Sequence, residues 1–461
     1  MYACGPTVYD FAHIGNFRTY AVSDFLLKTL QYNGYEVKYI MNLTDVGHLT
    51  GDNLGDADMG EDRMEKSAAR EGKSAWEIAA FYTEAFLKDF AALNLTKPKL
   101  FAKATDHIKE QIDLIKRLEE KGFTYEISDG IYFDTAKFPE YGKLSNLDEI
   151  KAGARIEINP EKKSPRDFAL WKFSVPRHSG LSRIDSGVAS LPRMTETPKR
   201  QMEWKSPWGV GFPGWHIECS AMSMKYLGES FDIHTGGVDL RETHHPNEIA
   251  QAEAVTGKPF VKYWVHPAFV LVKGERMSKS LGNNYKLYDL EEQKYDPLAL
   301  RYLYLQTHYR QEMNFTFPAL DAAQQALNHL RSIVSEWDSP KIGCAEYEKK
   351  FLTAINDDFN FPEALAIIWD LVKSDYPSSA KAQSLFKFDE VLGLNLSDIK
   401  KIRLLEIHEL PQEVQELVRD REKLRKEKKY MLADQLRSRI KKSGYDVTDT
   451  KRGIEIKEIS K

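Results

Sequence analysis

The spacing of hydrophobic positions changes along the chain, and each change marks an expected element. The first residues are apolar and end at Gly5-Pro6, and apolar positions then recur on one face from 20 to 32. A second apolar run covers 37–41, after a glycine-containing turn. A strand, a turn, a helix and a strand in this order predict a β-α-β unit, which begins a doubly wound parallel sheet.

The later pattern mixes helical spacing with short extended runs. Residues 174–203 are rich in Pro, Ser, Gly, Arg and Thr and poor in apolar residues, which predicts a long surface loop. The other elements expected, in chain order, are helices at 76–93 and 108–121, short strands over 125–172, a helix at 215–226, a strand at 231–234, a helix at 244–255, strands over 263–272 and helices from 296 to 394.

Length and composition limit the class of protein. A chain of 461 residues exceeds one ordinary core and predicts two to four domains. Its 42% hydrophobic and 29% charged residues are typical of a soluble globular protein, with no apolar run long enough for a membrane span. No secretory signal precedes the first strand. Three cysteines cannot build a disulfide framework, so we expect a cytoplasmic protein whose cysteines serve a metal rather than a bridge.

The net charge of −4 hides a basic tail. Between Arg419 and Lys442, eleven Lys or Arg residues stand against four Asp or Glu. Such a helical tail on a near-neutral body indicates a nucleic-acid contact surface. A solvated charged helix would give the same pattern, so charge alone leaves both interpretations open.

Two short motifs have the chemistry of phosphate binding. His13-Ile14-Gly15-Asn16 lies at the turn between the first strand and its helix, where free N–H groups and the helix dipole favour an anion. Gly15 would let an adenine ring approach the backbone. Far downstream, Arg276-Met277-Ser278-Lys279-Ser280 offers a lysine that can reach the β- and γ-phosphates of ATP. Donors placed in this way stabilise the charge that develops as pyrophosphate leaves.

A third group of residues has the donor types of a metal site. Cys4 ends the first strand, Cys219 lies in GWHIECSAM, and His244, His245 and Glu248 lie in HHPNE. Cys, Cys, His and Glu are ligands that zinc accepts, and positions 244 and 248 share one helix face. The spacing is non-local and contains no CxxC pair, so buried apolar cysteines and a packed histidine remain an alternative.

In this order the motifs resemble those of cysteinyl-tRNA synthetases, a family of class I aminoacyl-tRNA synthetases. The HIGH and KMSKS signatures of that class correspond to HIGN and RMSKS here, with Asn16 and Arg276 as departures. The other similar blocks are MYACGPTVYD, GWHIECSAM, FDIHTGGVDL, HHPNEIAQ, HYR and ADQLRSRI.

The resemblance implies an enzyme that activates L-cysteine with Mg²⁺-bound ATP and transfers it to tRNA(Cys), with one zinc ion per chain. It implies catalytic roles for His13, Asn16 and Lys279. The implied ATP-binding residues are His13, Gly15, Asn16, His234, Asp239, Arg276 and Lys279. Those implied for the amino-acid pocket are Thr44 and Trp215, and the implied zinc ligands are Cys4, Cys219, His244 and Glu248. Zinc would favour cysteine over serine because a thiol ionises far more readily than an alcohol.

The resemblance also implies an α/β architecture in several parts and a monomer. The parts are a Rossmann-type catalytic domain in two halves (1–100 and 208–290), an inserted connective domain (101–207, with a mobile loop at 177–203), a stem-contact region (291–318), a helical bundle (319–400) and an anticodon-binding module (401–461). Two other functions share some of these motifs: a cysteine ligase of mycothiol synthesis, which uses a sugar amine as acceptor, and a non-catalytic RNA-binding paralogue. The basic tail argues against the first, and intact His13 and Lys279 argue against the second.

Overall fold

The structure is a computed structural model, and it describes residues 1–46, 62–145, 159–175, 200–277, 281–398, 405–427, 429–450 and 453–458. The predicted Lys279 and nearly all of the predicted loop 177–203 lie outside these ranges. No helix within them is both long and apolar enough to cross a membrane.

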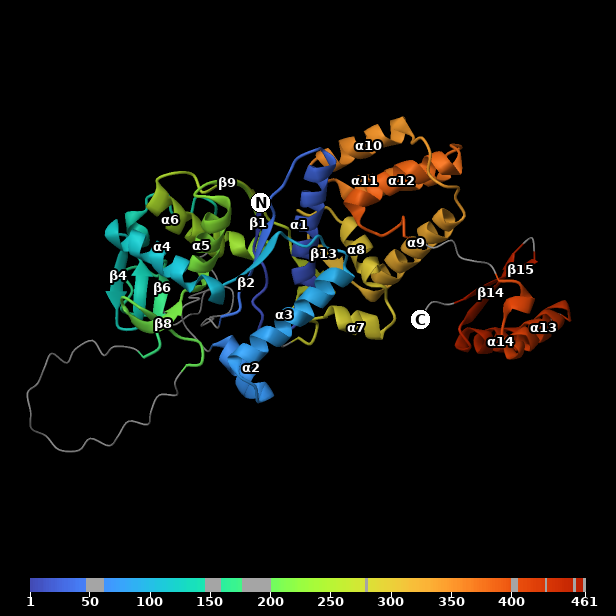
Figure 1. Cartoon of the computed structure of the whole chain (residues 1–461), viewed down its shortest axis with the longest axis horizontal. Coiled ribbons are helices and arrows are strands. Elements are labelled where there is room, and N and C mark those ends of the chain that lie inside the picture. The colour runs from blue at the N-terminus through green and yellow to red at the C-terminus, as the bar shows by residue number, and fades with distance from the viewer. Residues whose placement is uncertain are drawn as a thin grey trace, which may run out of the picture.

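A five-stranded parallel sheet forms the first unit, in the order β10-β9-β1-β2-β3. Its middle strand has only two residues, Tyr2–Ala3, yet pairs with a strand on each side. In Figure 1 the sheet lies between α5 and α6 on one side and α1 and α3 on the other. The bounds are β2 Ile40–Leu43, β3 Leu100–Lys103, β9 Phe231–Thr235, β10 Val261–Val265, α1 Ile14–Tyr32, α2 Arg63–Glu71, α3 Ala75–Ala92, α5 Trp215–Leu227 and α6 His244–Thr256.

Helix α1 begins earlier than its apolar pattern predicts. His13 is its N-cap, where Nδ1 accepts from the Asn16 amide at 3.1 Å and the Asn16 side chain accepts from the His13 amide at 3.0 Å. This reciprocal capping box satisfies two amides that would otherwise lack partners. The first turn is therefore helical and adds Ile14 and Phe17 to the buried apolar face, and the first phosphate-binding motif lies at a helix N-terminus.

A second five-stranded sheet, entirely antiparallel, lies in the insertion, in the order β4-β5-β6-β8-β7. Its core includes Phe133, Phe168 and Trp171, and α4 (Ile108–Glu120) packs on it. Two expected domain boundaries differ from the sheets. The first catalytic segment was expected to end at 100, but β3 continues the parallel sheet to Lys103, and the second was expected to begin at 208, but β8 still belongs to the antiparallel sheet. The bounds are β4 Thr124–Ile127, β5 Gly130–Phe133, β6 Phe168–Phe173, β7 Trp204–Ser206 and β8 Gly209–Pro213.

The chain then builds a small sheet and a set of helices. β11 (Val270–Val272) pairs with β12 (Glu275–Arg276) on one side and with β13 (Met313–Phe315) on the other. The helices that follow the parallel sheet pack against α1 and extend its hydrophobic core. They are α7 Leu287–Glu292, α8 Pro297–Leu305, α9 Phe317–Ser335, α10 Ala345–Asn356, α11 Phe361–Lys373 and α12 Ser378–Leu392.

The C-terminal residues form a unit with its own core. Two helices pack on an antiparallel hairpin around Val418, Ile440 and Val447 (Figure 1). Arg421 is 1% exposed and donates to both carboxylate oxygens of Asp449, at 3.0 and 2.6 Å. The bounds are α13 Gln412–Lys426, α14 Tyr430–Lys442, β14 Tyr445–Thr450 and β15 Gly453–Glu458, while short 3₁₀ helices occupy Thr105–His107, Thr135–Lys137, Val238–Arg241 and Ile407–Glu409.

Candidate metal and nucleotide site

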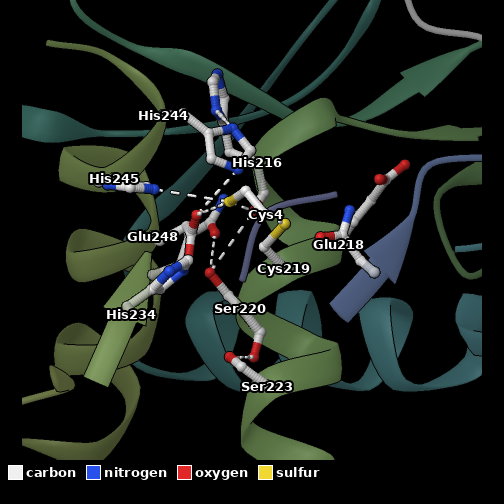
Figure 2. A network of polar contacts seen from close by, with 12 residues as sticks. Cys4, His216, Glu218, Cys219, Ser220, Ser223, His234, His244, His245 and Glu248 are labelled. Carbon is white, nitrogen blue, oxygen red and sulfur yellow. Dashed lines mark hydrogen bonds and ion pairs between the residues drawn. The ribbon is translucent and has the colours of Figure 1, made fainter. Parts of the chain in front are cut away.

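A buried cluster of donor atoms lies at the end of β1, between α5 and α6 (Figure 2). One ligand atom from each of Cys4, Cys219, His244 and Glu248 lies within 4.8 Å of the others, and all four residues are buried. The two sulfur atoms are 4.0 Å apart, and His244 Nε2 lies 2.9 Å from Glu248 Oε1. The structure thus brings together the four residues that the sequence nominated as zinc ligands.

Local structure explains why these side chains meet. Cys4 follows the central strand, and its amide donates to the Thr235 carbonyl on β9 at 2.9 Å. His244 and Glu248 occupy adjacent turns of α6, so their side chains point to the same side. Pro246 lies in the first turn of that helix, where its missing N–H removes no helical hydrogen bond. The proline therefore leaves the helix that carries both ligands intact.

Neighbouring groups in the cluster favour the ionised forms of Glu248, His244 and Cys219. Burial raises the pKa of Glu248, but His234 and His244 outweigh it and lower that pKa to about 2. Burial lowers the pKa of His244, but Glu248 and Cys219 raise it to about 10. The hydrogen bond from Cys4 lowers the pKa of Cys219 against the effect of burial, whereas burial raises that of Cys4. One thiol is thus already biased towards the thiolate, the form that binds metals.

Further histidines lie beside the cluster: His245, which the sequence grouped with it but not among the four ligands, and His216 and His266, which the sequence analysis did not name. His245 Nε2 lies 3.6 Å from Cys4 Sγ, and its Nδ1 lies 2.8 Å from His266 Nε2. His216 Nδ1 lies 2.9 Å from His244 Nδ1. Burial lowers the pKa of His245 well below its usual value and that of His266 to about 4, so both imidazoles are neutral near pH 7. The paired histidines in HHPNE and the one in GWHIE were the available sequence signals.

His234, predicted from the resemblance to bind ATP, lies inside this cluster. It is fully buried, its Nε2 lies 2.8 Å from Glu248 Oε2, and its ring stacks on Trp264 with centroids 4.8 Å apart. Together with Cys4, His245 and Glu248 it forms a second set of converging donors. Asp239, the other predicted contact from this segment, is exposed and lies against Gly237. Asp239 still lies near enough to the cluster to raise the pKa of Cys4, after larger effects from burial, Cys219 and Glu248.

Thr44 and Trp215, the predicted pocket residues, make different contacts near the cluster. The Thr44 hydroxyl donates to Glu218 Oε2 at 2.7 Å and accepts from Asn42 Nδ2 at 3.2 Å. Glu218 points away from the sulfur atoms in Figure 2 and is fully buried. The Trp215 ring lies 4.7 Å from that of His244, centroid to centroid. Thr44 thus contacts Glu218 of α5, and Trp215 contacts a predicted ligand directly.

The two phosphate-binding motifs lie against each other. A Cβ atom placed on Gly15 would be 2.3 Å from the Met277 methyl, so the second motif touches the first at a glycine, and a larger residue there would displace the Met277 side chain. The Ile14 amide donates to the Tyr285 carbonyl at 2.9 Å, and the segment after the second motif thereby reaches the same helix end. The Arg276 guanidinium is exposed and lies 4.2 Å from the Phe269 ring centroid. Lys279 lies outside the described residues.

Comparison with known proteins identifies the family. The family model for the class I (C) tRNA synthetase catalytic domain matches residues 1–183 and 193–325. The cysteine–tRNA ligase 1 of Burkholderia lata is 46% identical, over 98% of this chain and 91% of its own length. Those of Treponema denticola and Thermus thermophilus are 41% and 40% identical, over 97% and 98% of this chain and 93% of their own lengths. This chain belongs to the cysteine–tRNA ligase family.

The C-terminal half of this family member is matched as well. A DALR domain model covers residues 350–374, and the model for the cysteinyl-tRNA ligase anticodon binding domain covers 408–456. Among solved structures, Mycobacterium tuberculosis methionyl-tRNA synthetase aligns with a TM-score of 0.52 at 16% identity, covering 85% of this chain and 89% of that one. The Agrobacterium radiobacter leucyl enzyme in its tRNA complex gives 0.57 at 12% identity, covering 87% and 84%. These comparisons confirm the predicted family, enzyme class and fold.

Proposed function

We propose that this chain activates L-cysteine with ATP and transfers the cysteinyl group to the 3′ end of tRNA(Cys). The observation that carries the proposal is that two buried thiols, one of them with a lowered pKa, converge where Cys4 follows β1, in the connection that leads on to the HIGN end of α1. A site for binding a thiol substrate then adjoins a site for binding phosphates, as cysteine activation requires.

Zinc fits the donor set, because two sulfurs, one imidazole and one carboxylate are ligands that it accepts together. Cys4, Cys219, His244 and Glu248 would hold it. When bound, zinc supplies an open coordination position that favours a thiolate over a neutral hydroxyl. Discrimination by shape alone between cysteine and serine would be limited to about 1–3 kcal/mol. Thr44 and Trp215 would orient the rest of the amino acid.

The ATP-binding roles fall on the two motifs. Asn16 and His13 stand at the positive end of α1, where their reciprocal capping bonds fix both side chains and the helix dipole favours the α-phosphate. Gly15 keeps the backbone open to the adenine ring. Arg276 and Lys279 would bind the β- and γ-phosphates, with Mg²⁺ accompanying ATP, and stabilise the charge on departing pyrophosphate. Asp239 and His234 complete the predicted set.

The tRNA would meet the C-terminal half. The basic helices α13 and α14 supply the positive charge that phosphate contacts need, and binding should weaken as salt rises. This module favours tRNA over a sugar amine as the acceptor, because a small acceptor needs no such surface. The division into catalytic, connective, stem-contact, bundle and anticodon parts follows from the same proposal. So do a monomeric state, measurable by sedimentation, and a cytoplasmic location that keeps the thiols reduced.

Cysteine-dependent ATP–pyrophosphate exchange on zinc-loaded protein tests the proposal, with serine as the competing substrate. In the variant Cys219→Ala we expect zinc content to fall well below one per chain and exchange to drop by more than about 100-fold. Cys344→Ala is the matched control, because that cysteine is also buried but caps α10 far from the cluster. It should keep both zinc and exchange.

Two results would reject the proposal. Folded, zinc-loaded protein without exchange would point to an RNA-binding paralogue. Exchange with cysteine but no charging of tRNA(Cys), together with ligation to a sugar amine, would point to the small-molecule ligase. Equal exchange with serine would reject the selective role of the metal site.

A further inference from the structure

Arg18 lies on α1 just after the first phosphate-binding motif, and its side chain is 1% exposed. Among the residues that the structure describes, no carboxylate is paired with it and its Nε has no partner. Burial lowers the pKa of Arg18 to about 10, which still leaves the guanidinium charged near pH 7. Tyr304 and Glu312 oppose this shift, but neither accepts a hydrogen bond from the guanidinium. Burying a cation whose hydrogen bonds go only to neutral carbonyls is unfavourable, which suggests a specific role for Arg18.

The partners of Arg18 are four backbone carbonyls in two separate segments. Nη1 donates to Ala268 and Phe269, both at 2.9 Å. Nη2 donates to His308 at 3.1 Å and to Gln311 at 2.7 Å. One planar group with donors in a fixed fork can hold both segments at once, which a lysine ammonium cannot do with the same geometry.

The two segments are the starting points of neighbouring parallel strands. Residues 268–269 lead into β11 and residues 308–311 lead towards β13, and the strands pair with Val270 opposite Met313. They are also joined directly, since the Ala268 amide donates to the Tyr309 carbonyl at 2.8 Å. In Figure 1, β13 lies beside α1. Arg18 therefore fastens this small sheet to the helix that begins with HIGN.

The fastened sheet carries the second phosphate-binding motif. β11 turns at Lys273 and Gly274, both with positive φ, into β12, where Arg276 lies. The Arg276 guanidinium lies 4.2 Å from the ring centroid of Phe269. Phe269 is thus held through its carbonyl by Arg18 and supports Arg276 with its ring. A shift of this residue would move Arg276 relative to the N-terminus of α1.

We propose that Arg18 is a positioning residue for ATP, which holds the β11–β12 hairpin and its Arg276 in register with the N-terminal end of α1. The inference rests on the proposed function, in which both motifs bind the nucleotide. Arg18 acts through Phe269 and the strand ends, and it contributes geometry rather than a direct contact. A misplacement of about 1 Å in such an arrangement costs up to about 100-fold in rate.

The experiment compares Arg18→Lys with Arg301→Lys in full-length, zinc-loaded protein. Arg301 is the matched control, because it is 0% exposed and also binds backbone carbonyls around α1, but on the side of the helical bundle. We measure KM for ATP, KM for cysteine and kcat in pyrophosphate exchange, together with zinc content and the melting temperature. Partial unfolding removes active molecules and lowers the apparent kcat, but leaves the KM of the remaining molecules unchanged.

For Arg18→Lys we expect KM for ATP to rise by about 10-fold or more, with KM for cysteine and zinc content near wild type. Arg301→Lys should lower stability without changing KM for ATP. An unchanged KM for ATP in Arg18→Lys, or an equal rise in both variants, would overturn the inference. Loss of exchange in the wild type would instead refute the proposed function itself.

If Arg18→Lys does not fold, Phe269→Leu carries the test. Phe269 is only half-buried, and this change removes the ring under Arg276 while leaving the carbonyl that Arg18 binds. The KM for ATP should again rise, by several-fold, with zinc content unchanged. A wild-type KM for ATP in this folded variant would overturn the inference.

Discussion

Replacing Arg301 with methionine should destabilise the protein strongly. Arg301 on α8 is 0% exposed, and its guanidinium reaches three other helices. Nη2 donates to Asp24 Oδ2 on α1 at 2.6 Å. The other bonds go to backbone carbonyls: Leu93 and Asn94 after α3, both at 3.0 Å, and Leu392 at the end of α12, at 2.6 Å. Methionine fills similar space but offers none of these donors.

The cost can be worked out from what is left behind. Asp24 would become a buried carboxylate whose remaining bond, at 2.8 Å, comes from the Thr96 amide. Breaking a buried ion pair on one side costs about 3–5 kcal/mol, and each stranded carbonyl adds to this unless water enters. Against a total stability of about 5–15 kcal/mol, the change removes a large fraction. At about 2–4 °C per kcal/mol, the melting temperature should fall by about 10 °C.

Urea unfolding followed by tryptophan fluorescence measures this, because Trp369 donates to the Tyr302 hydroxyl next to Arg301 and reports on this packing. Refolding must be checked first, since a chain of this size can unfold irreversibly. Asp24→Asn and the double variant complete a thermodynamic cycle, in which we expect a coupling of at least about 1.5 kcal/mol. A loss below about 1 kcal/mol in Arg301→Met would refute this account of the buried pair.

Three further predictions follow from single contacts. Burial raises the pKa of Asp89 to about 6, with Glu291 adding to it, so the wild type loses stability as the pH rises through 6. In urea unfolding, Asp89→Asn should be more stable than wild type by about 1–2 kcal/mol at pH 7.5, allowing for partial solvent screening, and equally stable near pH 4. Gly15→Ala should raise KM for ATP by about 10-fold through its clash with the Met277 methyl, and the added change Met277→Ala should bring KM for ATP part of the way back to wild type. A KM for ATP that stays raised in the double variant would contradict the contact. Arg421→Met should unfold the C-terminal unit, so that charging of tRNA falls while pyrophosphate exchange stays at wild type; equal losses in both assays would contradict its independence.

The sequence predicted which helices and strands carry the site residues, but it did not predict which of these elements lie next to one another in space. His244 and Glu248 are four positions apart on a helix, so their common direction follows from helical geometry. Cys4 lies at the end of a strand next to the first motif, which places it near the helix end. Their meeting with Cys219 came from the family resemblance, because nothing in the spacing of distant segments specifies which strands pair.

What the sequence did not predict depends on long-range packing and on backbone partners. His266 follows β10, and only the pairing of β10 with β9 brings it beside His245. Arg18 was not singled out, because a charged residue on a helix normally faces solvent. Its partners are carbonyl oxygens, which every residue carries and no sequence pattern marks. The early start of α1 was missed for a related reason, since His13 and Asn16 cap the helix through polar contacts that an apolar periodicity does not register.

The central position of β1 has a consequence for how the protein is made. In the chain β1 comes long before its partner β9, so it must wait for β9 to be synthesised, and Cys4 lies 215 positions before Cys219. At about 5–20 residues per second, the delay is about 10–40 s. During that time one edge of the nascent sheet is unpaired and Cys4 is a lone thiol. Closure of the parallel sheet and assembly of the donor cluster therefore both wait for the segment from α5 to β10.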